Sequence, residues 1–149
     1  MDRGVGMMGG SLGGHATLMA MAMDNRIRVG AAMVPGGDYR LLMTHRLQQH
    51  QVPPDQFDEY YPPALDAAVR KFDPLHRAAQ FADRPLLMTC GGKDELVPAA
   101  AARSFYEAAR VHYSDPARIA LRVFEEAGHE TPPEAWEQQK QWLRDWLVR

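Results

Sequence analysis

A short apolar run that passes directly into a glycine-rich turn is the most constraining feature of the sequence. The run Val5-Gly6-Met7-Met8 is followed by Gly9-Gly10-Ser11-Leu12-Gly13-Gly14, and an apolar segment rich in alanine and methionine then extends to Met23. Small residues around Ser11 permit a sharp turn in which a strand and a helix approach each other closely. This order of strand, tight turn and helix is typical of folds that alternate strands with helices.

Three further segments have the short apolar character of strands, and the first two of them, like Val5–Met8, are near-continuous apolar runs, as expected of strands buried on both faces. They are Val29–Val34, Pro85–Cys90 and Ile119–Phe124. The last alternates more strongly than the others, because Arg122 separates Leu121 from Val123, and this favours a place nearer the sheet edge. Helical patterns cover Leu12–Met23, Pro98–His112 and Pro133–Val148. Strands that alternate with helices predict an α/β fold, a parallel sheet of about four strands flanked by helices, in one domain over residues 1–149.

The last helical segment carries three tryptophans, at positions 136, 142 and 146, with charged residues between them. Their spacing forms an apolar stripe, so we expect them to lie in the core against the sheet. The middle of the chain, residues 36–83, is rich in proline and has short helical patterns near Tyr39–His50, Ala64–Phe72 and Leu75–Phe81. A long excursion between two parallel strands serves either as a lid or substrate wall or as a plain crossover, and both interpretations stay open.

Composition excludes several classes of function. The 149 residues include 17 Lys and Arg and 19 Asp and Glu. This balance gives no excess of positive charge for binding nucleic acid or an anionic membrane. No apolar run is long enough to span a membrane, and the N-terminus lacks a signal-peptide pattern. The single Cys90 excludes an intramolecular disulfide and a cysteine-rich zinc site, so we expect a cytoplasmic setting. No histidine pair has His-Glu-x-x-His spacing, and we expect neither a metal nor a cofactor.

The segment Gly9-Gly10-Ser11-Leu12-Gly13 contains Gly-x-Ser-x-Gly, placed after a strand and before a helix as a nucleophile elbow requires. A serine nucleophile needs a base, and the base needs an orienting carboxylate. Asp94 follows one buried strand and His129 follows the last strand, so Ser11, Asp94 and His129 all fall at the carboxyl edge of the sheet. Ligands bind at this edge in open α/β folds. The order Ser, Asp, His is that of α/β-hydrolases.

Other interpretations of these residues remain open. The glycine-rich turn could be a plain turn or a phosphate-binding loop, although it lacks the Lys-Ser/Thr ending of a P-loop. Asp94 could instead cap a turn, and Glu95 is adjacent. His15 is expected to pack on its helix, and the remaining histidines are expected at the surface or at a helix end. They are His45, His50, His76 and His112.

Three segments together resemble the signature segments of α/β-hydrolases, nearest to the esterase, dienelactone hydrolase and prolyl-oligopeptidase-like branch. They are Gly9–His15, Gly91–Pro98 and Gly128–Glu130. The resemblance implies that Ser11 is the nucleophile, Asp94 the acid and His129 the base. It also implies that the backbone N–H of Leu12 is one oxyanion donor, and that Gly9 and Gly13 are the glycines of the elbow.

The resemblance extends only to the C-terminal half of that fold, a truncated or minimal α/β-hydrolase. The strands that precede the nucleophile strand in the family, and the loop that supplies a second oxyanion N–H, have no counterpart before Val5. Loss of one oxyanion donor costs roughly 100- to 1000-fold in turnover in a comparable hydrolase. The chain is therefore either a natural minimal enzyme or a fragment of a longer product.

The leading function is a serine hydrolase that cleaves carboxylic esters, with short acyl chains, through a Ser-His-Asp triad and an acyl-enzyme. Activity is then expected to rise with pH as the histidine base loses its proton. A non-catalytic interaction protein derived from a hydrolase and a serine peptidase are the alternatives.

The sequence also predicts that the chain associates with copies of itself. The strand Val5–Met8 has a neighbour on one side only, and the helix Leu12–Met23 is apolar around most of its circumference. An unpaired apolar edge is an association site, and two-fold symmetry is the commonest arrangement. We expect a homo-oligomer, a dimer or a multiple of it, that buries this edge and helix, with a neighbouring subunit as one source of the second oxyanion donor.

Overall fold

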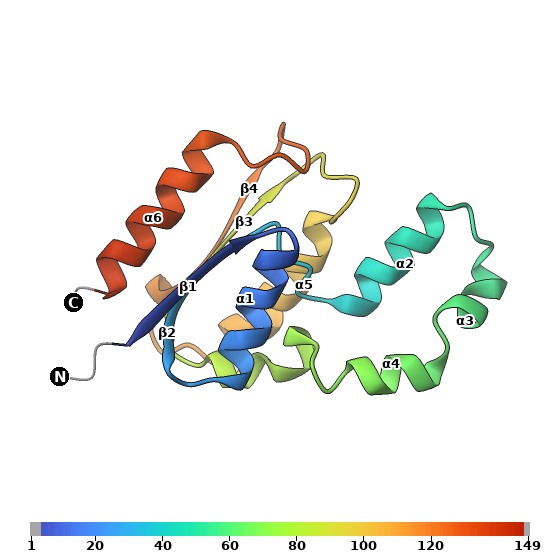
Figure 1. Cartoon of the computed structure of the whole chain (residues 1–149), viewed down its shortest axis with the longest axis horizontal. Coiled ribbons are helices and arrows are strands. Elements are labelled where there is room, and N and C mark those ends of the chain that lie inside the picture. The colour runs from blue at the N-terminus through green and yellow to red at the C-terminus, as the bar shows by residue number, and fades with distance from the viewer. Residues whose placement is uncertain (1–3, 148–149) are drawn as a thin grey trace.

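Four parallel strands in the order β1-β2-β3-β4 form the centre of the molecule (Figure 1). The structure, a computed structural model, describes residues 4–147. The strands are β1 (Val5–Gly10), β2 (Ile27–Met33), β3 (Leu86–Gly91) and β4 (Ile119–Phe124). The predicted fold class is confirmed, and β4 lies at a sheet edge as its alternating sequence indicates. Because all strands run in one direction, the segments that follow them meet at one edge of the sheet.

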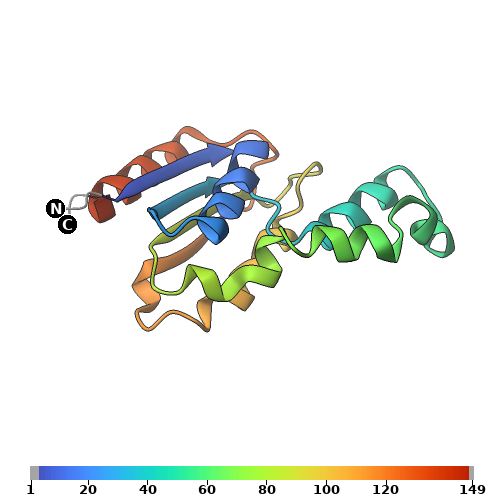
Figure 2. The same ribbon diagram turned by 60° about the horizontal axis from the view of Figure 1, so that its bottom comes forward.

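Helices cover the two faces unequally. On one face lie α1 (Leu12–Met23), α5 (Ala99–Arg110) and the 3₁₀ helix η2 (Pro74–Phe81), while α6 (Pro133–Leu147) covers the other (Figures 1 and 2). A further 3₁₀ turn, η3 (Pro116–Arg118), precedes β4. This arrangement of a parallel sheet between helical layers follows from the right-handed crossovers that connect its strands.

The core lies between the sheet and the layer of α1, α5 and η2. Leu18 and Met21 of α1 are fully buried, and the rings of Phe81 and Phe105 meet edge-on at 4.9 Å between centroids. β2 and β3 are the central strands, and apart from Arg28 at the start of β2 their residues are buried. Continuous apolar sequence in these two strands is therefore the consequence of burial on both faces.

The expectation that the tryptophans of α6 lie in the core is wrong for Trp136, which is 39% exposed. The residues of α6 that are fully buried against the sheet are Ala135 and Gln139, and Trp142 and Trp146 are partly buried and pack on each other. α6 is the single helix on its face within residues 4–147, so its wide aromatic stripe extends beyond the area that the sheet covers. Position 148, predicted as the end of this helix, lies outside the described residues.

The excursion over residues 36–83 divides into two parts. Its first part projects beyond the carboxyl edge of the sheet as an arm (Figures 1 and 2). The arm consists of α2 (Tyr39–Gln49), η1 (Pro54–Gln56), α3 (Phe57–Tyr60) and α4 (Pro63–Val69). The second part, η2, returns to the body, where Phe81 fills the core. The excursion thus contains both a projecting segment and a core crossover.

Two buried aspartates join the arm to the body. Asp38 caps α2 by accepting the Leu41 N–H at 2.9 Å, and its other oxygen accepts the Ser104 hydroxyl at 2.7 Å. Asp73, at the return point, accepts the backbone N–H groups of Tyr39 and Leu75, each at 3.2 Å. Because Asp73 bonds to both the outgoing and the returning chain, α2 has a defined position beside the sheet edge.

Candidate active site

Ser11 occupies a strained turn between β1 and α1. Its φ of 54° and ψ of −118° lie in a region that residues with a Cβ atom rarely adopt. Its backbone N–H donates to the Met33 carbonyl at 3.0 Å, which joins the turn to the end of β2. The hydroxyl is thereby held at the carboxyl edge of the sheet, as in a nucleophile elbow.

The glycines of this turn have different roles. A Cβ atom on Gly9 would lie 2.4 Å from the Gly13 carbonyl oxygen, and one on Gly14 would lie 2.2 Å from the Met33 carbonyl oxygen. A Cβ atom on Gly13 would meet nothing within 4 Å. The structure therefore agrees with the expectation that position 9 requires glycine. The second position that has no room for a Cβ atom is Gly14, not Gly13 as expected.

Replacement of Gly14 by alanine is expected to destabilise the fold by roughly 1–3 kcal/mol, because the new methyl group overlaps a backbone oxygen that cannot swing away. Gly13→Ala is the matched control and is expected to be neutral or slightly stabilising, since alanine favours a helix over glycine by about 1 kcal/mol. Urea unfolding of both variants measures the difference. Equal stability of the two variants would contradict this assignment.

Ser11, His129 and Asp94 form a continuous hydrogen-bonded relay. Nε2 of His129 lies 3.0 Å from the Ser11 Oγ, and Nδ1 lies 2.9 Å from Oδ2 of Asp94. The Asp94 side chain is fully buried, whereas that of His129 is 31% exposed. Since a carboxylate only accepts, Nδ1 carries the proton and Nε2 is free to accept the serine hydroxyl. The structure thus brings together three residues that are 118 positions apart at their extremes.

The second oxygen of Asp94 fixes the carboxylate in its loop. Oδ1 accepts the backbone N–H groups of Leu96 and Val97 at 2.8 and 2.9 Å. The turn-capping role that the sequence left open is therefore real and coexists with the contact to His129. Because both oxygens have partners, the carboxylate has one orientation, which is the condition for orienting an imidazole.

The loops that carry Asp94 and His129 are joined through their backbones. The N–H of Gly92 donates to the Phe124 carbonyl and that of Lys93 to the Ala127 carbonyl, both at 2.9 Å. A Cβ atom on Gly91 would lie 2.1 Å from the Gly128 carbonyl oxygen. The sequence analysis included Gly91 and Gly92 in the segment Gly91–Pro98 but gave them no role of their own, although their position after a buried strand and directly before Lys93-Asp94 is a usable signal.

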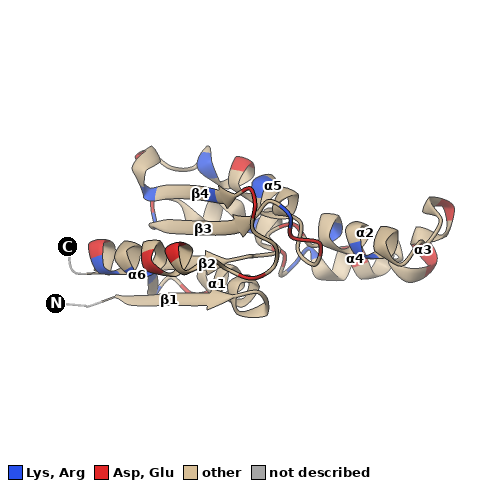
Figure 3. Ribbon diagram, turned by 90° about the horizontal axis from the view of Figure 1, so that it is seen from above, with Lys and Arg blue, Asp and Glu red and all other residues tan. Residues whose placement is uncertain are grey.

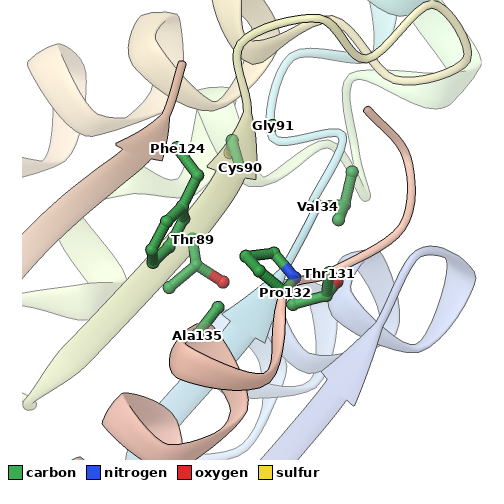
Figure 4. Close-up of a pocket in the computed structure, with 8 residues that line it drawn as sticks. All are labelled: Val34, Thr89, Cys90, Gly91, Phe124, Thr131, Pro132 and Ala135. Atoms are coloured by element: carbon green, nitrogen blue, oxygen red, sulfur yellow. The ribbon is translucent and has the colours of Figure 1, made fainter. Parts of the chain in front are cut away.

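A small pocket lies beside Thr131 and Pro132, which follow His129 in the chain (Figure 4). It has no room for a water molecule. It is lined by Val34, Thr89, Cys90, Gly91, Phe124, Thr131, Pro132 and Ala135. Val34 has a φ of 48°, an unusual conformation for a β-branched residue, and its N–H donates to the Thr89 carbonyl at 2.7 Å. Close packing beside Thr131 and Pro132 thus restricts the segment that follows His129.

A cavity of about 180 Å³ opens beside Ser11. It is lined by Ser11, Leu12, His15, Val34, Gly36, Tyr39, Leu42, Arg46 and Val97. α2 thus forms one wall of the candidate site, although the sequence analysis left the role of its segment undecided. His15 lies one helical turn after Ser11 and faces this cavity, and burial lowers the pKa of its imidazole.

The other cysteine and histidine candidates for the nucleophile and the base either lie away from Ser11 or lack the required chemistry. Cys90 is 3% exposed, and burial raises the pKa of its thiol to about 12, so it is not a thiolate nucleophile at neutral pH. His50, His76 and His112 are exposed, and His45 donates from Nε2 to the Glu95 carbonyl at 2.7 Å. The backbone N–H of Leu12 begins α1 directly after Ser11, the place expected for an oxyanion donor.

No group of three or more His, Cys, Asp or Glu side chains suited to hold a metal ion occurs within residues 4–147. None of the helices in this range is long and apolar enough to cross a membrane.

The family follows from comparison with known proteins. Residues 2–149 match the prolyl oligopeptidase family. The chain belongs to that family. The match, together with the parallel sheet and the solved structures described next, confirms the resemblance to α/β-hydrolases that the three sequence segments indicate.

Individual relatives of this family member include esterases. This chain is 29% identical over 146 residues to the Bacillus subtilis (strain 168) protein named "Putative esterase YitV". The match covers 96% of this chain and 57% of that protein. Among solved structures, TT1662 from Thermus thermophilus is 30% identical with a TM-score of 0.71, over 95% of this chain and 54% of that chain. Acetyl xylan esterase 1 from Thermoanaerobacterium sp. JW/SL YS485 is 20% identical with a TM-score of 0.77, over 99% and 47%. The chain therefore spans about half the length of these relatives.

Proposed function

We propose that this member of the prolyl oligopeptidase family is a serine hydrolase that cleaves carboxylic esters. The observation that supports the proposal most strongly is the relay in which His129 lies 3.0 Å from the Ser11 hydroxyl and 2.9 Å from the buried Asp94 carboxylate. In such a relay the imidazole can take the serine proton, which activates the hydroxyl for attack on an acyl carbon.

The proposed reaction has two steps. Ser11 Oγ attacks the ester carbonyl while its proton passes to Nε2 of His129, and collapse of the tetrahedral intermediate returns that proton to the departing alcohol. Water then loses a proton to the same nitrogen and attacks the acyl-serine, which releases the carboxylic acid and restores the Ser11 hydroxyl. Asp94 keeps the imidazole tautomer and stabilises the imidazolium without taking its proton.

The developing oxyanion requires donors near the attacked carbonyl. The N–H of Leu12 at the start of α1 is well placed for this, because the helix N-terminus also favours negative charge. A second N–H comes from outside the described residues in this proposal, either from further chain or from a second subunit. Each such donor accounts for roughly 100- to 1000-fold in turnover.

The cavity beside Ser11 supports a short acyl group. Its volume of about 180 Å³ is small, which favours a short acyl group over a long one. The esterase names among the relatives agree with an ester substrate. A peptidase is the second candidate, because the family takes its name from a peptidase and solved acylaminoacyl peptidases share the fold.

A fluorophosphonate probe tests the proposal, because it labels only an activated serine. The wild-type chain is expected to be labelled at Ser11, located by mass spectrometry of the modified peptide, and a chain that stays unlabelled would favour a non-catalytic interaction protein. Comparison of 4-nitrophenyl butyrate with the matching 4-nitroanilide then separates esterase from peptidase. Faster turnover of the anilide would replace the esterase proposal by the peptidase one.

We further propose that a second copy of the chain covers the β1 edge. β1 hydrogen bonds to β2 alone among the strands that the structure describes, with Val5 58% and Met8 37% exposed. No Lys, Arg, Asp or Glu occurs between residues 4 and 23, so the whole β1–α1 unit is uncharged (Figure 3). An apolar, uncharged strand edge favours pairing with an identical edge.

Light scattering at micromolar concentration is expected to give a dimer or a multiple of it. Val5→Lys is expected to shift the population toward monomer, because a lysine on an edge strand opposes pairing. Val111→Lys is the control, since Val111 is also an exposed apolar residue, at 70%, but lies at the C-terminal end of α5 and not on the β1 edge. A well-folded wild-type monomer would refute the proposal.

A further inference from the structure

Arg46 is the one permanently charged residue among those that line the cavity beside Ser11. Arg46 lies in the last turn of α2 and is exposed. No side-chain hydrogen bond or ion pair engages this guanidinium within residues 4–147. By contrast, Arg40 and Arg70 of the same arm both pair with Asp66. Arg46 is thus a cation that borders the candidate site and has no partner of its own.

The rest of the cavity wall carries no charge that would compensate this cation. Four of its side chains are aliphatic, those of Leu12, Val34, Leu42 and Val97. His15 is neutral at neutral pH, because burial lowers the pKa of its imidazole. No Asp or Glu is part of the wall. A ligand group that reaches Arg46 therefore meets a positive charge beside a largely apolar wall.

The end of α2 that carries Arg46 is attached to the loop that carries Asp94. His45 donates from Nε2 to the Glu95 carbonyl at 2.7 Å, and the Gln49 side-chain amide donates to the same oxygen. These residues flank Arg46 by one position before and three after. The guanidinium is consequently held on a helix that is joined to the active site, which limits the entropy lost when it binds a ligand.

From these contacts we propose that Arg46 selects esters whose acyl group ends in a carboxylate, such as half-esters of short dicarboxylic acids. The inference rests on the proposed function, since it assigns the acyl group of that same reaction. The aliphatic side chains would contact the methylene groups between the two carbonyl carbons. The planar guanidinium would bind the distal carboxylate through paired N–H···O hydrogen bonds. A succinyl group, with two methylene groups and a terminal carboxylate, is a short acyl group of the kind that the small cavity favours.

The test compares two substrates that differ in charge but not in shape. Monomethyl succinate carries the carboxylate, and methyl succinamate carries a neutral amide in its place, and a pH-stat follows hydrolysis of both. The wild-type chain is expected to prefer the charged ester by roughly three- to tenfold in kcat/KM, the range for a partly exposed charge-assisted contact. Because the pair is accessible to solvent, this preference is expected to fall as ionic strength rises.

Three variants locate the preference. Arg46→Gln is expected to abolish the preference, Arg46→Lys to keep part of it, and Arg46→Glu to reverse it. Arg110→Gln is the matched control, because Arg110 ends α5 at the opposite edge of the sheet from Ser11 and should leave the preference intact.

The failure of this inference differs from the failure of the proposed function. Equal turnover of the two esters by the wild-type chain, or a preference that survives in Arg46→Gln, would overturn the role of Arg46 and leave the serine hydrolase in place. Hydrolysis of both esters that persists in Ser11→Ala would instead overturn the proposed function itself.

Discussion

Replacement of Ser11 by alanine is expected to reduce kcat for ester hydrolysis by at least about 10⁴-fold, since removal of a triad nucleophile leaves only oxyanion binding and positioning. The hydroxyl makes its one side-chain contact with His129, so its loss affects the chemistry rather than the fold. Both serine and alanine carry a Cβ atom, and the strain of a φ of 54° is therefore the same in the variant. Steady-state assays with 4-nitrophenyl butyrate measure the loss.

Ser114→Ala is the matched control for this experiment. The Ser114 hydroxyl bonds to Asp83 at 2.8 Å, in the turn before η3 and β4, far along the chain from the candidate site. This variant is expected to retain wild-type kcat. Thermal unfolding of both variants should give transitions near that of the wild type. Retention of most of the activity in a folded Ser11→Ala variant would refute the triad.

Asp94→Asn is the second change with a large expected effect, a fall in kcat of about 10⁴-fold, as in a triad whose aspartate becomes asparagine. The amide oxygen can still accept the Leu96 and Val97 N–H groups, so its NH₂ then faces Nδ1 of His129. An NH₂ donor opposite Nδ1 favours the tautomer with the proton on Nε2. That nitrogen then no longer accepts the Ser11 proton.

The expected signature of this variant is a large loss of kcat with a small change in thermal stability, because the turn keeps its two backbone hydrogen bonds. Asp83→Asn is the control, since its carboxylate also caps a turn through the Ser114 N–H but does not contact the relay. If Asp94→Asn lowered the thermal unfolding temperature strongly and lost activity through unfolding, Asp94 would act mainly as a structural cap.

Several features could be predicted from sequence because they depend on local pattern. Near-continuous apolar sequence correctly predicted β2 and β3 as buried on both faces, and the alternation around Arg122 indicated that β4 lies nearer an edge. The same expectation is wrong for β1, which is partly exposed because it has a neighbour on one side only among the described strands. α1 begins and ends at the predicted residues, Leu12 and Met23. In a parallel sheet, the ends of strands necessarily share an edge, so the proximity of Ser11, Asp94 and His129 follows from their places after three strands.

Other features could not be predicted, because they depend on what lies opposite each residue. Gly13 and Gly14 are indistinguishable by sequence, yet only Gly14 faces the Met33 carbonyl. Trp136 belongs to an apolar stripe, but its exposure depends on how much sheet lies beneath α6. A Cβ atom on Gly91 would lie 2.1 Å from the Gly128 carbonyl oxygen in the loop of His129, a contact between segments about forty residues apart.

The sequence by itself therefore determined the order of the elements, the sheet edge at which the chemistry lies and the identities of its three candidate catalytic residues. The tertiary structure decided the wall of the cavity. The sequence predicts a helix near Tyr39–His50, but the position of α2 depends on the buried carboxylates of Asp38 and Asp73 and on the bond from His45 to Glu95. Those long-range contacts place Arg46 at the wall of the cavity that Ser11 also lines, and no local pattern encodes contacts between residues so far apart in the chain.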